Sequence, residues 1–199
     1  MGHIKKSKMK RCPWIVEDEL YIKYHDEEWG VPVHDDIKQF EFFVLESAQA
    51  GLSWLTVLRK RENYRKAYDN FDPLIISKYN GKKIKKLLTN SGIIRNRMKI
   101  EASINNAKRF LEIQKEFGSF DRYIWSFTDY KQVVNKWKNI GEIPSKTELS
   151  DRISKDLKEH GFKFVGSTII YAHLQAVGIV NDHIVSCFRY RQVIDKMLR

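Results

Sequence analysis

Gly161-Phe162-Lys163-Phe164-Val165-Gly166-Ser167-Thr168 separates a polar segment from an apolar one, and this stretch decides the fold of the chain. The polar segment ends at the first glycine, a residue that is common just after a helix. The second glycine and two hydroxyl residues open an apolar run with helical spacing. The pattern predicts two helices joined by a tight hairpin at about residues 150–178. Backbone amides at the start of the second helix would point outward, and such amides bind anions.

The charge of the hairpin and of the whole chain indicates which anion would bind. The 199 residues include 36 Lys and Arg against 25 Asp and Glu, a formal net charge of +11. A protein this basic commonly binds a polyanion, although lysine is so widespread here that solubility is an equal explanation. Lysine beside outward-pointing amides favours a DNA phosphate. The hairpin residues that we expect to contact DNA are Gly161, Lys163, Gly166, Ser167 and Thr168.

Helical periodicity and capping residues dominate the rest of the sequence. Asp72 and Asn80 stand where N-terminal caps are expected, as does Asp35 or Asp36. Residues 128–145 show little periodicity, and no segment alternates as a strand does. We therefore predict an all-α fold. The expected helices are 36–50, 53–68, a short one from 73, 80–90, 95–117, 120–127, and one from 145 or 150 to 160.

The length suits one domain with a substantial core or two small lobes that share one. Residues 1–10 are basic without the apolar core of a signal peptide, so we expect a disordered arm there. No segment approaches the roughly 20 apolar residues that cross a membrane. We expect a cytoplasmic protein with no membrane partner. Nothing suggests a coiled coil or a repeat interface, so a monomer is the expectation.

Two cysteines, each with a histidine nearby, form a candidate metal site. Cys12 and Cys187 lie near opposite ends of the chain; His25 follows the first, and His183 precedes the second by four residues. On a helix that spacing would put His183 and Cys187 on one face. Two thiolates and two imidazoles suit tetrahedral zinc, with no position left for an activated water. The alternative is two buried free cysteines and unrelated histidines.

A carboxylate beside an apolar helical face, with aromatic residues around it, forms a candidate binding pocket. Glu46 lies in the last turn of the first predicted helix, where a buried carboxylate is costly without a partner. The aromatic residues are Tyr21, Tyr24, Trp29 and Trp54. They suit a stacking site for a flat ring whose amino group donates to Glu46. The alternative is an exposed glutamate and ordinary core aromatics.

Several separated motifs together resemble bacterial DNA-3-methyladenine glycosylases of type I, members of the helix-hairpin-helix DNA glycosylases. The motifs are Tyr24–Gly30, Glu46–Trp54, Ser91–Arg95, Gly161–Thr168 and Asn181–His183. The resemblance runs from about Arg11 to Cys187. It implies a single glycosylase domain of two helical lobes at 11–190, with the hairpin near 150–178, and a tail at 191–199.

The resemblance also implies roles for individual residues. Glu46 would be the catalytic-site carboxylate that recognises methylated adenine, with Trp54 and Tyr24 as the walls of the pocket and Trp29 and Tyr21 beside them. Gln49 and Leu52 would fill the gap that the extruded nucleotide leaves. The hairpin would anchor the DNA backbone. One structural zinc would join the N- and C-terminal segments through Cys12, His25, His183 and Cys187.

The implied activity is hydrolytic release of free 3-methyladenine from alkylated double-stranded DNA, which leaves an abasic site. The methylated base is cationic and departs neutral, so little acid assistance is required. Many related glycosylases use an aspartate shortly after the hairpin; Asn181 stands at that position here, with Asp182 beside it. Phe164 stands where the related hairpins often carry glycine. We expect the protein to select the damaged base by flipping it out of the duplex and binding it, with no lyase step. We expect its affinity for DNA to come from Lys163 and the cluster Arg59–Lys66.

Two alternatives stay open at this point. The first is a helix-hairpin-helix glycosylase for a different damaged base, including one that uses a lysine in a lyase step. The second is a non-catalytic, zinc-stabilised DNA-binding module, which would need no buried carboxylate. A zinc hydrolase is disfavoured because the four ligands would close the metal site.

Overall fold

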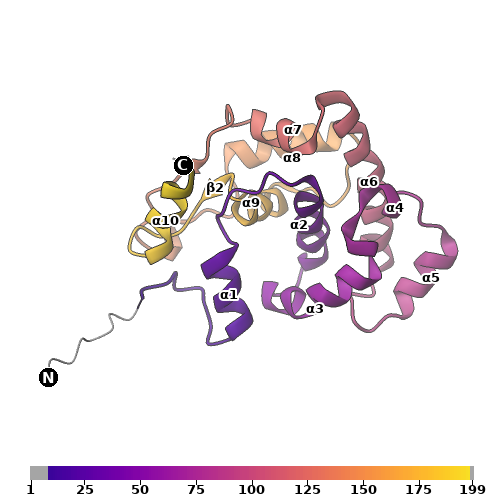
Figure 1. Ribbon diagram of the computed structural model, residues 1–199, viewed down its shortest axis with the longest axis horizontal. Helices are drawn as coiled ribbons and strands as arrows, with labels where there is room; N and C mark the ends of the chain where they lie inside the picture. The colour runs from indigo at the N-terminus through magenta and orange to yellow at the C-terminus, as the bar shows by residue number, and fades with distance from the viewer. Residues whose placement is uncertain (1–8, 198–199) are drawn as a thin grey trace, which may run out of the picture.

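The computed structural model describes residues 9–197, and helices dominate it (Figure 1). The helices of the first half are α1 (Glu19–Glu27), α2 (Asp36–Gln49), α3 (Trp54–Ala67), α4 (Pro73–Ile76), α5 (Gly81–Thr89) and α6 (Arg97–Phe117), with a 3-10 turn η1 (Asp69–Phe71). Those of the second half are α7 (Phe120–Ser126), α8 (Glu148–Glu159), α9 (Ser167–Ala176) and α10 (Phe188–Met197), with a 3-10 turn η2 (Ile140–Glu142). The predominantly helical fold is confirmed.

Helix α2 lies at the centre of the fold. It contacts α3 and α6 on one side and α7 and α9 on the other, so it joins the two halves of the molecule (Figure 1). Every residue from Gln39 to Ala48 is buried. A helix that is enclosed on all sides places its polar residues in the interior as well. Glu46 is therefore inside the protein because of where α2 lies, although the sequence around it is only partly apolar.

The predicted caps begin their helices. Asp35 accepts a hydrogen bond from the Lys38 amide at 2.7 Å, and Asp72 and Asn80 cap α4 and α5 in the same way. Helix α6 begins two residues later than expected because Asn96 caps it. Helix α1 was not predicted; Asp18 caps it, and its short length leaves little periodicity to recognise.

Two other segments differ from the expectation. The stretch 128–145 contains η2 and a strand of two residues, β1 (Val133–Val134), which pairs in parallel with β2 (Val180–Asn181). The pair is too short for any alternation to appear in the sequence. The segment 191–199, which we expected to form a tail, continues α10 as far as Met197. Of the expected arm at 1–10, residues 1–8 lie outside the described residues.

Gly178 closes the turn between α9 and β2, and we expect Gly178→Ala to destabilise the protein by about 3 kcal/mol or more. Its φ is +70°, and an added Cβ would lie 2.3 Å from the carbonyl carbon of Val31. That backbone is fixed, since the Val33 amide donates to the Val177 carbonyl at 3.0 Å. Thermal unfolding measures the loss. Gly81→Ala is the control, because its added Cβ meets nothing within 4 Å; equal effects of the two changes would contradict the prediction.

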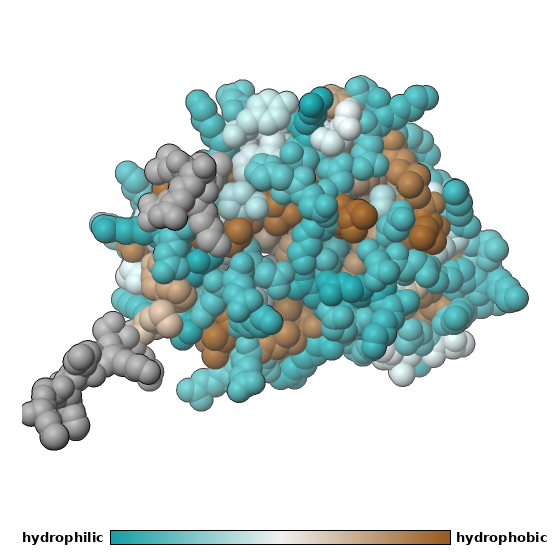
Figure 2. Space-filling view, in the orientation of Figure 1, coloured by the Kyte–Doolittle hydropathy of each residue, from teal (hydrophilic) through white to brown (hydrophobic). Residues whose placement is uncertain are grey.

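No helix among residues 9–197 is long and apolar enough to cross a membrane. Figure 2 shows hydrophilic side chains over most of the face that it presents, with hydrophobic ones in separate patches.

Candidate functional site

A cavity of about 440 Å³ lies between the α1–α2–α3 side of the molecule and α9. All five residues that the sequence analysis placed in a base pocket line it: Tyr21, Tyr24, Trp29, Glu46 and Trp54. They come from α1, the turn after it, α2 and the first turn of α3. The structure therefore brings together side chains that are up to 33 residues apart in sequence, and their use in base binding stays a prediction.

Glu46 is the acidic group of the cavity. Glu46 is only 4% exposed. Burial raises the pKa of its carboxyl group from 4.5 to about 8. Within residues 9–197 no hydrogen-bond donor or cation contacts its carboxyl group. A buried carboxyl without a partner is destabilising. It is thus available for a ligand that donates hydrogen bonds or carries positive charge.

Aromatic rings surround that carboxyl. The ring centroids of Tyr24 and Trp54 lie 5.4 Å apart at an interplanar angle of 52°. The indole nitrogen of Trp54 is buried and has no hydrogen-bond partner among the described residues. Trp14 completes the group, and the centroid of its ring lies 5.1 Å from that of Tyr21 and 4.9 Å from that of Trp29. The sequence analysis missed Trp14, because nothing near it in the sequence marks it as part of a site.

The opposite wall of the cavity was also missed. It consists of the segment 140–145 and of Thr168, Tyr171, Ala172 and Gln175 on α9. These residues lie about a hundred positions from Glu46 in the sequence, in a segment without periodicity and on a helix that follows the hairpin. Only the tertiary fold places them against the aromatic rings.

Asp182 fixes this opposite wall. Its two carboxylate oxygens accept four hydrogen bonds: from Asn135 and Trp137 at 2.7 Å each, from Gln175 at 2.7 Å, and from the hydroxyl of Tyr171. Asp182 is fully buried and does not line the cavity. It directly follows β2. Its position marks it as a residue that orients Tyr171 and Gln175.

Asn181 is likewise turned away from the cavity. Its side-chain amide donates to the Tyr190 carbonyl at 3.2 Å, and its side-chain oxygen accepts from the His183 amide at 3.2 Å. The residue is fully buried. These contacts hold the turn between β2 and α10 in place. The position at which related enzymes carry a catalytic aspartate is therefore occupied here by a residue with structural contacts.

We expect Asp182→Asn to lower base release by about 10-fold and to lower the melting temperature. An amide presents a donor where the carboxylate accepts, so two of the four donors lose their partner, at about 1–3 kcal/mol for each unsatisfied group. Base release and thermal unfolding measure the two effects. Tyr171→Phe removes one donor and is expected to act in the same direction; full activity in that variant, with none in Asp182→Asn, would instead indicate direct catalysis by Asp182.

A tight turn joins α8 to α9 at the place where the hairpin was predicted, and the two helices pack against each other. The amide of Phe162 donates to the Leu157 carbonyl and that of Gly161 to the Lys158 carbonyl, both at 2.9 Å, which is the Schellman arrangement. Gly161 has φ +79°, and Phe164 adopts the left-handed region at φ 56°. Gly166 begins α9 without a side-chain cap. Among the described residues nothing caps the amides of that first turn, so they are available to bind an anion.

Gln49 is the last residue of α2 and lines the cavity, and Leu52 lies in the short loop between α2 and α3. The Gln49 side chain donates to the Leu52 carbonyl at 2.8 Å, and the Leu52 amide donates back to the Gln49 carbonyl at 2.7 Å. Leu52 is 39% exposed. A large apolar side chain on an exposed tight loop beside the cavity suits a wedge that enters a base stack. We call residues 49–52 the wedge loop.

The basic cluster Arg59–Lys66 is largely engaged in ion pairs, which alters its expected role. Arg61 binds Glu28 at 2.8 Å and Glu41 at 2.6 Å. Arg59 pairs with Asp18, and Arg65 pairs with Glu41 and Glu62. Although burial alone would raise the pKa of Glu41, the Arg61 guanidinium keeps that pKa below its usual range. Arg61 thus joins α1, α2 and α3, which carry the walls of the cavity.

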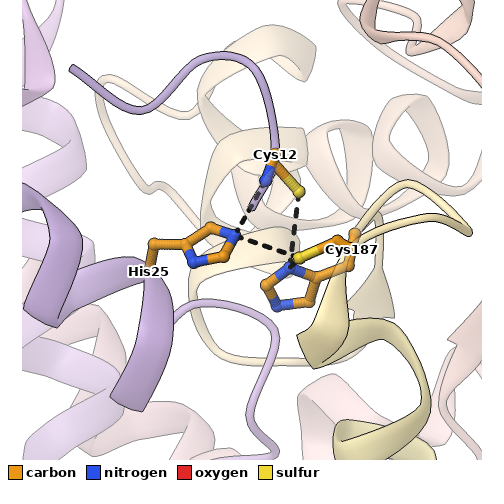
Figure 3. Close-up of side chains that lie close together, drawn as sticks. Cys12, His25 and Cys187 are labelled. Atoms are coloured by element: carbon orange, nitrogen blue, oxygen red, sulfur yellow. Dashed lines mark hydrogen bonds between the residues drawn. The ribbon is translucent and has the colours of Figure 1, made fainter. Parts of the chain in front are cut away.

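The four candidate metal ligands come together. One donor atom from each of Cys12, His25, His183 and Cys187 lies within 4.8 Å of all the others, and all four residues are buried. Figure 3 shows the two sulfur atoms and the imidazole rings directed toward one point. The Cys187 sulfur lies 3.5 Å from His25 Nε2 and 3.6 Å from His183 Nδ1. A hydrogen bond from the Cys12 thiol lowers the pKa of Cys187, which favours a thiolate there.

The outer contacts of the histidines suit metal binding as well. His25 uses its other nitrogen to contact Asp26 at 2.7 Å, and His183 uses its own to contact the Trp29 carbonyl at 3.0 Å. Such partners fix the tautomer and orientation of metal-binding imidazoles. His183 and Cys187 lie in the turn before α10, and not on one helical face as expected. Trp29 packs edge-on against His183, with centroids 4.7 Å apart, so the cluster supports a wall of the cavity.

Known proteins share this fold and sequence. The family model of methyladenine glycosylases matches residues 14–190. DNA-3-methyladenine glycosylase 1 of Escherichia coli is 48% identical over 182 residues, 92% of this chain and 97% of that protein. DNA-3-methyladenine glycosylase of Haemophilus influenzae is 48% identical over 177 residues, 89% of this chain and 96% of that protein.

Solved structures agree with these relatives. A crystal structure of 3-methyladenine DNA glycosylase I superimposes with a TM-score of 0.88 at 49% identity, over 90% of this chain and 98% of that one. A structure of the enzyme from Staphylococcus aureus, which describes 3-methyladenine recognition, has a TM-score of 0.87 at 34% identity, over 90% and 96% of the two chains. The fold and the sequence agree, and the chain belongs to the methyladenine glycosylase family.

Proposed function

We propose that this protein is a DNA repair glycosylase that excises 3-methyladenine from alkylated double-stranded DNA and leaves an abasic site. The observation that carries the proposal is the buried carboxyl of Glu46, which has no partner among the described residues and lies among aromatic rings. A cavity of about 440 Å³ is large enough for a purine. The named activity of the relatives supports the same conclusion.

The charge of the substrate explains how this pocket selects it. Methylation at N3 makes adenine cationic, and a cation stacks well on aromatic faces such as those of Trp54 and Tyr24. Glu46 accepts from the exocyclic amine and favours the positive ring. A normal adenine has the same amine, but it is neutral and so gains neither the cation–π attraction nor the attraction between the positive ring and the carboxylate. A damaged base pair also costs less to open, so the extruded base reaches the pocket more readily.

Hydrolysis then requires little from the protein. Water attacks C1′ of the sugar, the N-glycosylic bond breaks with its electron pair moving to the base, and the proton of the water passes to solvent. The base leaves as neutral 3-methyladenine, so no proton has to be supplied. Asn181 and Asp182 hold structural contacts, and this mechanism assigns them no catalytic step. No lyase step is involved, because Lys163 is exposed on the hairpin and does not line the cavity.

DNA binding is assigned to the hairpin and the wedge loop. The amides that open α9, with Gly161, Gly166, Ser167 and Thr168, contact the phosphate backbone, and Lys163 adds a charge that salt screens. Leu52 and Gln49 occupy the place of the extruded nucleotide. The net charge of +11 adds affinity that does not depend on sequence.

We further propose that Cys12, His25, His183 and Cys187 hold one structural zinc. The donor set of two sulfurs and two imidazole nitrogens, all buried within 4.8 Å of one another, fits tetrahedral Zn²⁺. Zinc bound there would supply structural stability and no reactive water. The ligands would then fasten the segment before α1 to the turn before α10.

Base release from DNA treated with a methylating agent tests the proposal. Chromatography of the products is expected to show 3-methyladenine, with 7-methylguanine left in the DNA. Release of a different set of bases would favour the alternative of another specificity on the same fold. Salt-dependent DNA binding with no base release would favour the non-catalytic module. Borohydride trapping of an imine would overturn the absence of a lyase step.

A further inference from the structure

Helix α6 makes hydrogen bonds to both segments that the proposed function places on DNA. One is the wedge loop at 49–52, between α2 and α3. The other is the hairpin at 161–166, between α8 and α9. The two segments are more than a hundred residues apart in sequence, and α6 is an element that hydrogen-bonds to both of them. Helix α6 neither lines the cavity nor belongs to the expected DNA-contacting residues.

Lys99 connects α6 to the wedge loop. Its ammonium group donates to the Ala48 carbonyl at 2.8 Å and to the Ala50 carbonyl at 2.6 Å. Both carbonyls lie at the C-terminal end of α2, where the helix dipole favours a cation. Within residues 9–197, these are the only hydrogen bonds that reach 48–52 from another element. The other hydrogen bonds of the loop are local, so Lys99 fixes its position.

Asn106 connects the same helix to the hairpin. Its side-chain amide donates to the Lys163 carbonyl at 2.8 Å, and its side-chain oxygen accepts from the Lys163 amide at 2.8 Å. Asn105 adds a hydrogen bond to the Gly161 carbonyl at 2.8 Å. Asn106 is 2% exposed. A buried amide that pairs with both backbone groups of one residue holds that residue in a single register.

We propose that Lys99 and Asn106 are positioning residues through which α6 holds the wedge loop and the hairpin at a fixed separation. Seven residues are about two helical turns, so both side chains leave the same face of α6, about 10.5 Å apart along its axis. A backbone anchor and a wedge can extrude one nucleotide only if their spacing matches the duplex. The inference rests on the proposed function, because it assigns the wedge loop to base extrusion.

This arrangement places the two residues of α6 outside the base pocket, although Gln49 of the wedge loop also lines the cavity. Glu46 and the aromatic walls are held by α1, α2 and α3, and neither Lys99 nor Asn106 lines the cavity. Loss of Lys99 should thus impair the opening of a duplex and leave the pocket intact. Single-stranded DNA has no pair to open, so its bases enter the pocket without the wedge.

The test compares Lys99→Met with Lys99→Arg, which keeps the charge and the donors. Lys85→Met is the matched control, because Lys85 is an exposed lysine on α5 and its loss removes the same charge. The substrates are methylated poly(dA)·poly(dT) and methylated single-stranded poly(dA). For Lys99→Met we expect kcat/KM on the duplex to fall by about 100-fold and on the single strand by less than about threefold. Lys99→Arg should recover most of the duplex activity, and free 3-methyladenine should bind all variants equally.

If the role of Lys99 is purely structural, kcat/KM falls on both substrates together, and that outcome would overturn the inference. So would full duplex activity in Lys99→Met. Leu52→Ala separates this failure from failure of the proposed wedge: if Leu52→Ala keeps duplex activity, the wedge assignment itself is wrong. Asn106→Leu is expected to weaken binding to both DNA forms while free-base affinity stays unchanged. If Asn106→Leu is folded and its DNA affinity is unaltered, the positioning role of Asn106 is contradicted.

Discussion

Replacing Glu46 with alanine is expected to weaken binding of free 3-methyladenine by about 100-fold and to lower base release from methylated DNA by a similar factor. A hydrogen bond to a charged group contributes about 1.5–3 kcal/mol, and 100-fold corresponds to about 2.7 kcal/mol. Glu46 is 4% exposed, so water replaces its contact with the base poorly. Isothermal calorimetry with the free base measures the affinity, and chromatography of released bases measures the activity.

Glu101→Ala is the control for this change, since it removes an exposed carboxylate on α6 that pairs only with Arg97 among the described residues. It should leave both measurements within about twofold of the unchanged protein. Unchanged free-base affinity in Glu46→Ala would remove the recognition role from Glu46 even if activity fell. Loss of DNA binding in the same variant would point to a folding defect, and thermal unfolding would reveal one.

The pH dependence of stability provides a second test of the role of Glu46, and it uses the isosteric change Glu46→Gln. Burial raises the pKa of Glu46 from 4.5 to about 8. Between these values the folded protein keeps a proton that the unfolded chain has released, so the free energy of unfolding falls as pH rises through this window. At about 1.4 kcal/mol for each pKa unit, the loss is several kcal/mol in order of magnitude and is complete above pH 8.

Glutamine has no such titration, so Glu46→Gln should gain stability over the unchanged protein as pH rises from 5 to 9. Melting temperatures of both proteins across that range test the point. If the difference in melting temperature between the two proteins does not vary with pH, the carboxyl group of Glu46 is ionised and stabilised in the folded protein. Glu46 thus destabilises the folded protein at neutral and alkaline pH, as is expected of a charged group whose role is to bind a ligand.

Local features of the sequence predicted the helices well, and tertiary features explain most of what it missed. Asp35, Asp72 and Asn80 marked helix starts because capping depends on neighbours in the chain. Trp14 and Tyr171 reach the cavity only through packing, and no spacing rule connects them with Glu46. Arg61 illustrates the same limit: a lysine- and arginine-rich helix resembles a DNA-binding surface until the structure places Glu28 and Glu41 beside it.

The cluster of candidate metal ligands was anticipated for a reason that proved partly wrong. His183 and Cys187 were expected on one helical face, and they lie in a turn. That turn brings them together because the Cys187 amide donates to the Ile184 carbonyl at 2.8 Å. The partners Asp26 and the Trp29 carbonyl, which orient the two histidines, have no signature that could be found in the sequence. Residue types identified the cluster, whereas its geometry required the fold.

Cys187→Ala is expected to abolish the binding of one zinc per chain and to lower the melting temperature by more than about 10 °C. Apparent zinc-binding free energies at such sites are roughly 10–16 kcal/mol in small domains, so even a fraction of that value is a large part of a protein's stability. The ligands also connect segments about 175 residues apart, since Cys12 and Cys187 stand near the two ends. Metal analysis of purified protein and thermal unfolding, with and without a chelator, measure both effects.

The position of Trp29 extends this prediction to the pocket. Trp29 lines the cavity and packs against His183, and its carbonyl contacts the same imidazole at 3.0 Å. Loss of the metal should therefore weaken 3-methyladenine binding as well, although no zinc ligand lines the cavity. Glu46→Ala is the reciprocal control, because it should lose base affinity and retain one zinc. A Cys187→Ala protein that lacks metal, unfolds at the original temperature and binds the base normally would refute the structural role of the cluster.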